Sequence, residues 1–160
     1  MSRNINPAVG GNIETIIYDS THPLTWNDAG GGGTVTVSYP VTVTVPTNGG
    51  VSADDDAFTT ESIDLTNFDT MIIDINYEID ADFSGEVNAG DIIITVGGNS
   101  VFNFTMQANF TTRNDRFVLD ISALSVSGII NISVGANGFG SADGDTTLTL
   151  NEMKLINRAI

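Results

Sequence analysis

The chain has 160 residues, 41% of them hydrophobic, and its 20 acidic against 5 basic residues give a formal net charge of −15 at pH 7. This length and hydrophobic content are enough for one packed core, whereas the scarcity of Lys and Arg argues against binding to nucleic acid or to an anionic membrane surface. Cysteine is absent, which excludes a disulfide framework and a thiolate zinc site.

The first strand expected in chain order covers residues 14–18, and a loop over residues 19–33 follows it. The loop contains His22, Trp26 and four glycines in succession, which cannot hold one conformation without support from neighbouring elements. The residues before this strand lack the apolar stretch of a secretory signal peptide, so we expect no signal peptide. No apolar run in the chain is long enough for a membrane-spanning helix.

Residues 34–45, TVTVSYPVTVTV, alternate strictly between larger apolar side chains and small or polar ones. Successive side chains on a strand point to opposite faces, so the pattern predicts one strand whose odd-numbered residues form a buried face. Pro40 has no N–H to donate to a neighbouring strand, which indicates an edge position or a bulge. Residues 46–56 combine turn-forming residues with three consecutive aspartates, and we predict an internal boundary there.

Six more strands are predicted downstream, at residues 71–79, 92–96, 101–106, 117–121, 129–134 and 146–156. In the first of these, Ile73, Ile75 and Tyr77 alternate with polar residues and should face the core. In the last, the apolar positions change parity before Met153, which predicts a β-bulge.

Turn-forming residues separate these strands. Gly97-Gly98-Asn99 predicts a hairpin, residues 137–145 a longer loop, and residues 120–125 a single turn. No segment has sustained helical periodicity. The expected fold class is therefore all-β, an antiparallel β-sandwich of about eight or nine strands with no long helix.

The segments FTT at 58–60 and IDLTNF at 63–68 precede a hydrophobic strand and a glycine-turned hairpin, and FVLDIS at 117–122 precedes an isoleucine-rich strand and a closing strand. This order resembles jelly-roll β-sandwich modules of the galactose-binding or carbohydrate-binding-module type, of the kind found in head-fibre, decoration and tail proteins of tailed viruses. The resemblance covers about the C-terminal hundred residues and implies a jelly roll over residues 51–160. By analogy, residues 1–50 would be an N-terminal arm plus strands used for attachment or oligomerisation, or strands that join the sandwich.

No catalytic residue is predicted. His22 is the only histidine, and its Gly/Pro loop holds no nucleophile motif such as G-x-S-x-G, so we interpret it as a surface loop residue. The glycine runs precede strands, whereas phosphate-binding glycine loops precede helices. We therefore expect that the protein is not an enzyme.

A calcium loop is the sharpest motif. Asp80, Asp82, Ser84 and Asp91 carry oxygen ligands at the spacing of an EF-hand-like loop, with Gly85 at its turn. The segments on either side of this loop have the pattern of strands, whereas an EF-hand loop lies between helices. Asp91 also has a shorter side chain than the Glu usual at the last position of such a loop. The alternative is therefore a turn between two strands that binds no metal and no cofactor. Two other acidic groups have the same chemistry: Asp54 to Asp56, and Asp143 with Asp145.

Aromatic side chains on a flat face or in loops can stack on sugar rings, although no pattern in the chain identifies a binding residue. The candidates are Trp26, Tyr18, Tyr39 and Tyr77. Phe102, Phe104 and Phe110 occupy alternate positions and are assigned to the core instead.

The resemblance and the missing catalytic set predict a non-enzymatic structural protein of a virus particle: a capsid decoration, head-fibre or tail-associated subunit. Its expected partners are other virion proteins and copies of itself, with a homotrimer taken from the class, and its expected location is the extracellular particle. The alternative is a carbohydrate-binding module that recognises a host-surface glycan, with or without Ca²⁺.

Overall fold

The computed structural model describes residues 13–47, 53–79, 89–107, 111–137 and 144–157, and statements about structure refer to these. This part of the chain forms eleven β-strands and no helix, so the predicted all-β class is confirmed, with more strands than expected. Within it, no helix has the length and apolar character needed to cross a membrane.

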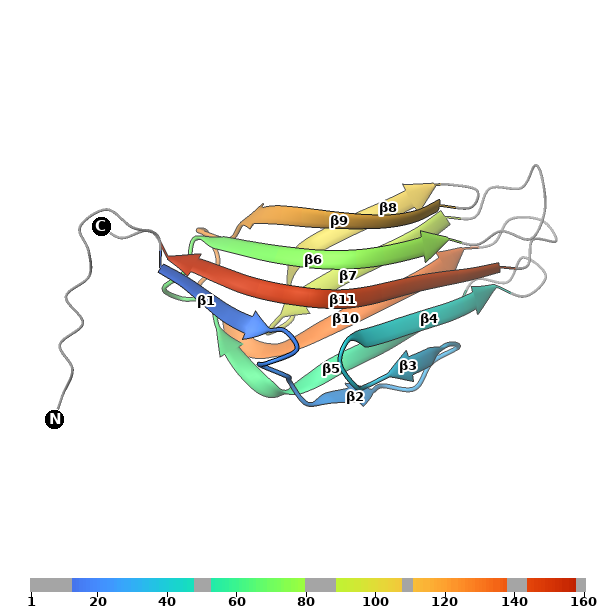
Figure 1. Cartoon of the computed structure of the whole chain (residues 1–160), viewed down its shortest axis with the longest axis horizontal. Coiled ribbons are helices and arrows are strands. Elements are labelled where there is room, and N and C mark those ends of the chain that lie inside the picture. Colours follow the sequence, from blue (N-terminus) through green and yellow to red (C-terminus); the bar gives the residue numbers. More distant parts are fainter. Residues whose placement is uncertain (1–12, 48–52, 80–88, 108–110, 138–143, 158–160) are drawn as a thin grey trace, which may run out of the picture.

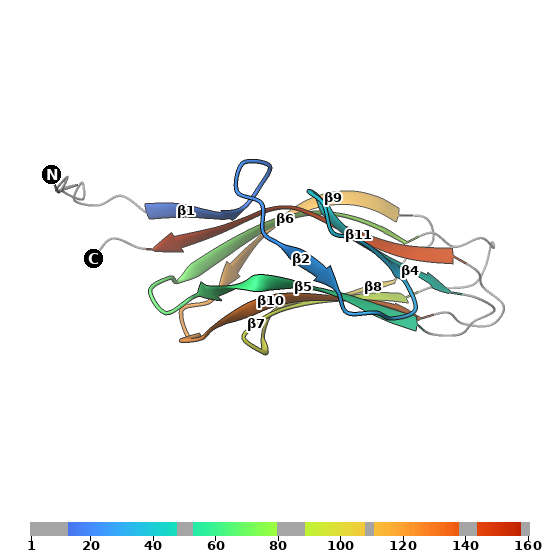
Figure 2. The same cartoon turned by 90° about the horizontal axis from the view of Figure 1, so that it is seen from below.

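The strands form two stacked antiparallel sheets (Figures 1 and 2). Sheet A contains, in spatial order, β3 (Thr34–Thr36), β4 (Val41–Thr47), β11 (Gly144–Asn157), β6 (Thr70–Ile79) and β9 (Thr111–Asp120), and β1 (Ile13–Tyr18) also pairs with β11. Sheet B contains β2 (Trp26–Asp28), β5 (Ala53–Asp64), β10 (Ser127–Asn137), β7 (Ala89–Val96) and β8 (Asn99–Gln107). The predicted antiparallel sandwich is confirmed.

The last described strand, β11, pairs with the first, β1. On one of its edges, β4 pairs with the first half of β11 and β1 with the second half (Figure 1). Ile13 lies opposite Asn157 in this pairing. The strands in residues 13–47 therefore lie inside the sandwich, three in sheet A and β2 in sheet B; an attachment or oligomerisation role for residues 1–50 stays a prediction.

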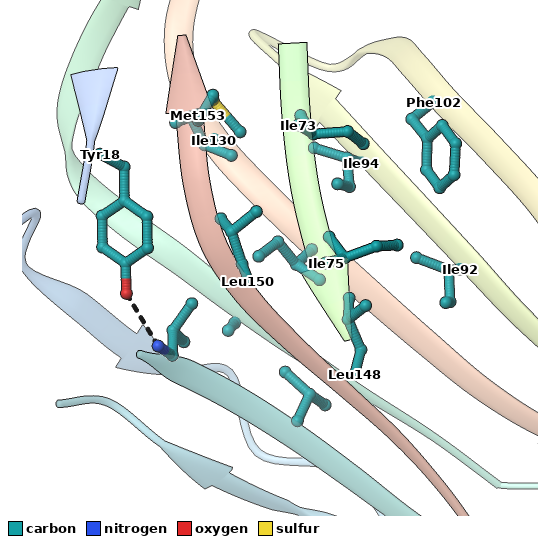
Figure 3. Close-up of a cluster of buried hydrophobic side chains, with 14 of the residues drawn as sticks. Tyr18, Ile73, Ile75, Ile92, Ile94, Phe102, Ile130, Leu148, Leu150 and Met153 are labelled. Carbon is teal, nitrogen blue, oxygen red and sulfur yellow. Dashed lines mark hydrogen bonds between the residues drawn. The ribbon is translucent and has the colours of Figure 1, made fainter. Parts of the chain in front are cut away.

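The core lies between the sheets and follows the period-2 pattern. Ile73, Ile75 and Tyr77 of β6 are buried, as predicted. In β11 the register shifts between Leu150 and Glu152, so that Leu150 and then Met153 both face inward (Figure 3). The predicted β-bulge is confirmed. It restores the inward direction of the apolar side chains after Leu150, so that both halves of this 14-residue strand pack against the same core.

The prediction of one strand over residues 34–45 is wrong. The chain reverses at residues 37–40, so β3 and β4 form an antiparallel hairpin in which Val35 lies opposite Val43. Val37 and Tyr39, predicted to be buried, are 47% and 41% exposed in this turn. The reversal contains a cis Tyr39–Pro40 peptide bond. β3 ends at Thr36 and Pro40 stands immediately before β4, so the position predicted to be an edge or a bulge lies in the turn, where a missing N–H interrupts no ladder.

The division of the chain at residues 46–56 stays a prediction, but the turn expected there is strand at both ends of the segment, since β4 runs to Thr47 and β5 begins at Ala53. The three aspartates of this segment belong to β5, a 12-residue strand of sheet B. Asp55 points inward and is 2% exposed, and its carboxylate accepts hydrogen bonds from the N–H groups of Gly33 (3.1 Å) and Asp56 (2.8 Å). A buried carboxylate is tolerated here because backbone donors satisfy it.

Gly33 lies where no side chain fits, because a Cβ atom there would collide with the Thr44 carbonyl oxygen and approach the Asp55 side chain to 3.1 Å. We expect Gly33→Ala to lower the free energy of unfolding by about 1–3 kcal/mol, since the obstructing atom is backbone. Denaturant unfolding measures this. Gly135→Ala is the control, because a Cβ there meets Asp91 at an ordinary 3.7 Å; an equal loss in both variants would contradict the steric account.

Candidate functional site

The outer face of sheet B carries a pocket with a volume of about 390 Å³. It lies over β5, β10 and β7, and its lining residues are Ala29, Asp56, Phe58, Thr95, Gly98, Ile129 and Asn131. Ala57 and Thr59 are buried, so the alternation of β5 places Asp56 and Phe58 on the opposite, outer face. The strand register then aligns Phe58 with Asn131, and Asn131 with Thr95, in a row across the sheet.

Polar atoms around this row lack protein partners. The Asn131 amide donates to Asp56 Oδ2 at 3.3 Å, but Asp56 Oδ1 and Asn131 Oδ1 are buried and make no hydrogen bond. Asn27 Nδ2 is in the same state, and Asn27 lies opposite Phe58 in the pairing of β2 with β5. Buried polar groups are normally satisfied, so this concentration beside an aromatic residue is typical of a polar recognition site.

Two backbone segments hold the ends of the pocket. Ala29 donates its N–H to the Asp56 carbonyl oxygen at 3.0 Å, which fixes the chain after β2 against β5. At the other end, Gly97 and Gly98 have φ of 56° and 78° and form the predicted hairpin turn between β7 and β8. The Gly97 N–H donates to the Ile129 carbonyl oxygen at 3.0 Å, so the walls are fixed by the sheet itself.

Among the described residues, acidic side chains occur in both sheets, whereas Lys and Arg occur in one sheet alone. The five strands of sheet B contain no Lys, Arg or His over their described lengths. In the part of the chain that the structure describes, the cations Arg113, Arg116 and Lys154 belong to β9 and β11 of sheet A. Lys154 lies between Glu14 (2.9 Å) and Glu152 (3.1 Å), and hydrogen bonds to both raise its pKa. The pocket face is therefore acidic, and no described Lys or Arg lies on it to balance the charge.

A smaller pocket of about 270 Å³ opens at one end of sheet A, beside Asp69, Asp120 and the exposed Val118. Asp120 Oδ1 accepts hydrogen bonds from both the N–H and the hydroxyl of Ser122, and Asp69 Oδ1 accepts one from Thr70. These contacts are those of turn residues that stabilise their own loop. This pocket also lacks an aromatic lining residue, so the sheet B pocket is the better candidate.

Most of the aromatic residues considered for sugar stacking are in the core. Tyr18, Trp26 and Tyr77 are buried, and Tyr18 packs edge-on against Trp26 with ring centroids 5.7 Å apart. Tyr39 is exposed, and its hydroxyl donates to the Asn151 carbonyl oxygen at 3.0 Å. The core assignment is confirmed for Phe102 and, as a partly buried residue, for Phe104; Phe110 lies outside the described residues.

His22 lies on the surface, in the predicted loop. Its Nδ1 is 3.0 Å from Asp19 Oδ1 and 2.9 Å from the Thr21 hydroxyl, an arrangement within one turn of chain. Hydrogen bonds from Thr21, and next from His22, lower the pKa of Asp19 to about 2. Asp19, Thr21 and His22 therefore stabilise their own loop. That the protein is not an enzyme stays a prediction, which an activity assay can test.

The calcium prediction concerns residues outside the described ones, since Asp80, Asp82, Ser84 and Asp143 are not among them. Asp91, its last proposed ligand, lies in β7. The run Asp54 to Asp56 alternates between the two faces of β5, so its carboxylates do not converge. Over the described stretches, no three His, Cys, Asp or Glu side chains are grouped as metal ligands.

No family model and no curated protein sequence matches this chain. Solved structures do match it. The N-terminal cellulose-binding domain of Cellulomonas fimi β-1,4-glucanase C aligns over 89% of this chain and 92% of that domain, with a TM-score of 0.50 and 14% identity. CBM27-1 of Caldicellulosiruptor saccharolyticus, solved with mannohexaose, aligns over 89% and 96%, with a TM-score of 0.49 and 11% identity. The mannan-recognising module TmCBM27 aligns over 93% and 99%, with a TM-score of 0.49 and 8% identity.

At these identities the similarity concerns the fold. The chain has the jelly-roll β-sandwich that the sequence led us to expect, and it spans nearly the whole length of the cellulose-binding domain. The matching structures named above are carbohydrate-binding modules, whereas the expected relation to virus particle proteins finds no counterpart among them.

Proposed function

We propose that this chain is a carbohydrate-binding module that holds a glycan chain in the sheet B pocket. The observation that carries the proposal is that Phe58 lines a pocket together with Asp56 and Asn131, each of which has a buried Oδ1 without a partner. A sugar ring has an apolar face of C–H groups and an edge of hydroxyls. An aromatic side chain can pack against the first, and planar amide and carboxylate groups can bind the second.

The fold supports the same proposal. The cellulose-binding domain of Cellulomonas fimi glucanase C shares this sandwich along nearly its whole length. A fold alone does not assign a function, so the main support for the proposal is the lining of the pocket. A structural role in a virus particle, a homotrimer and an extracellular location stay predictions, because neither the described residues nor the comparisons bear on them.

The direct experiment is a screen of the purified protein against an array of neutral, acidic and amino-sugar glycans, followed by calorimetric titration of the best binder. We expect Phe58→Ala to weaken that binding at least about tenfold, since aromatic anchors dominate such interfaces. Val118→Ala is the matched control, because Val118 is 68% exposed on sheet A. Failure to bind any glycan on the array, or equal affinity of Phe58→Ala and the parent protein, would refute the proposed site.

A further inference from the structure

Among the residues that line the sheet B pocket, the buried polar atoms without a hydrogen-bond partner are both acceptors, Asp56 Oδ1 and Asn131 Oδ1. The unpartnered buried donors Trp26 Nε1 and Asn27 Nδ2 belong to β2 and do not line the pocket. A ligand that satisfies the lining residues must therefore bring donors. A neutral hydroxyl brings one donor, whereas a protonated amine brings three together with a positive charge.

The surrounding charge favours the same kind of ligand. Asp54 and Asp56 lie on the outer face of β5, and no strand of sheet B supplies a cation. The described cations lie on the other sheet, where Arg113 (3.3 Å from Asp115) and Lys154 are already paired. An anionic sugar such as a uronate would therefore meet uncompensated carboxylates, while an ammonium group would be attracted to them.

We propose that the sheet B pocket selects a glycan that carries free amino groups, a polymer of 2-amino-2-deoxy sugars, over neutral and acidic glycans. This selectivity rests on the proposed function, because it names the sugar class for the same pocket. Phe58 packs against a ring face, and Asp56 Oδ1 and Asn131 Oδ1 accept hydrogen bonds from the ammonium group. N-acetylation removes both the charge and two of the three donors, so it cancels the preference.

The test compares β-1,4-linked hexamers of glucosamine, N-acetylglucosamine and glucose, which differ only in the group at C2. Calorimetric titration at about pH 6 keeps both the amine and the carboxylates charged. We expect the glucosamine hexamer to bind at least about tenfold tighter than the glucose hexamer, as for a charge-assisted hydrogen bond. The advantage should fade at about pH 9, because an amine weakened by the electron-withdrawing oxygen atoms of a sugar ring has a pKa no higher than the value of about 8 for an α-amino group and is neutral there.

The net charge of −15 would attract any polycation, so the variants must separate the pocket from diffuse attraction. Asp56→Asn removes one charge inside the pocket and should abolish most of the amine preference. Asp74→Asn removes one charge from β6 of sheet A and should leave the preference unchanged. Hexalysine, which carries amines without sugar rings, should bind more weakly than the glucosamine hexamer and without dependence on Phe58.

The outcomes distinguish the two proposals. If the glucose hexamer binds in a Phe58-dependent way and the amine adds nothing, the amine selectivity is wrong and the proposed glycan site stands. If Asp74→Asn weakens binding as much as Asp56→Asn, or hexalysine binds as tightly as the sugar, the attraction is diffuse and the selectivity is overturned. If no array glycan and no hexamer binds, the proposed function fails and the selectivity fails with it.

Discussion

Leu150→Ala should lower the free energy of unfolding by about 2–5 kcal/mol, the range for truncating a fully buried leucine. Leu150 has no exposed surface and lies on β11 between Val41 of β4 and Ile75 of β6 (Figure 3). The neighbouring strands are hydrogen-bonded on both edges, so the site cannot collapse onto the space left by the missing atoms. The cost should therefore include a cavity term in addition to the lost hydrophobic transfer free energy.

Denaturant unfolding followed by circular dichroism measures this effect. Val118→Ala is the control, since this β-branched residue of β9 is 68% exposed and its truncation should change stability by less than about 0.5 kcal/mol. A loss below about 1 kcal/mol in Leu150→Ala would mean that the sheets are less tightly packed at β11 than the structure indicates.

Tyr18→Phe should cost about 1–3 kcal/mol, although it removes a single oxygen atom. The Tyr18 hydroxyl accepts a hydrogen bond from the Val41 N–H at 2.8 Å, at the point where the chain enters β4 (Figure 3). Both residues are buried, so without this oxygen the N–H has no partner and no access to water. Tyr39→Phe is the matched control: its hydroxyl also bonds to backbone, but the side chain is 41% exposed and water can take its place.

A second readout of Tyr18→Phe is the dependence of stability on alkaline pH. Burial raises the pKa of Tyr18 above 10.0 in the folded state. The folded protein thus holds this proton more tightly than the unfolded chain, so the stabilisation is complete below pH 10.0 and is lost as pH rises through the folded-state pKa. Tyr18→Phe should show a shallower alkaline loss than the parent. Parallel pH profiles in the two proteins would contradict the link to this residue.

The two-residue alternation was sufficient to predict which face of β6 is buried, since Ile73, Ile75 and Tyr77 carry that pattern unbroken. It was misleading at residues 34–45, because an alternating run looks the same whether it is one strand or a hairpin that returns with matching parity. Pro40 was the signal that distinguished the two. In β5 three consecutive aspartates predict a turn from sequence, because one of the two backbone donors that satisfy Asp55, the Gly33 N–H, comes from a distant glycine run; the other is the N–H of the adjacent Asp56.

The candidate site was missed for a related reason. Asn27, Phe58 and Asn131 form a row only because of the register between β2, β5 and β10, and register is a property of strand pairs that one strand's sequence does not contain. A local signal did exist: Phe58 stands between Ala57 and Thr59, and a large ring flanked by small buried residues is expected to point outward. The unpartnered oxygens of Asp56 and Asn131, by contrast, have no sequence signature, because an oxygen lacks a partner only when no donor lies within hydrogen-bonding distance in the folded structure.

The pairing of Ile13 with Asn157 has a topological consequence. Opposite residues of an antiparallel pair are about 4.5–5.5 Å apart, so these two positions can be bridged by a very short peptide. The fold can therefore be carried as an insert within a surface loop of a host polypeptide. Equally, a circularly permuted gene that joins these positions and opens the chain at the Gly97-Gly98 turn would preserve every strand of both layers.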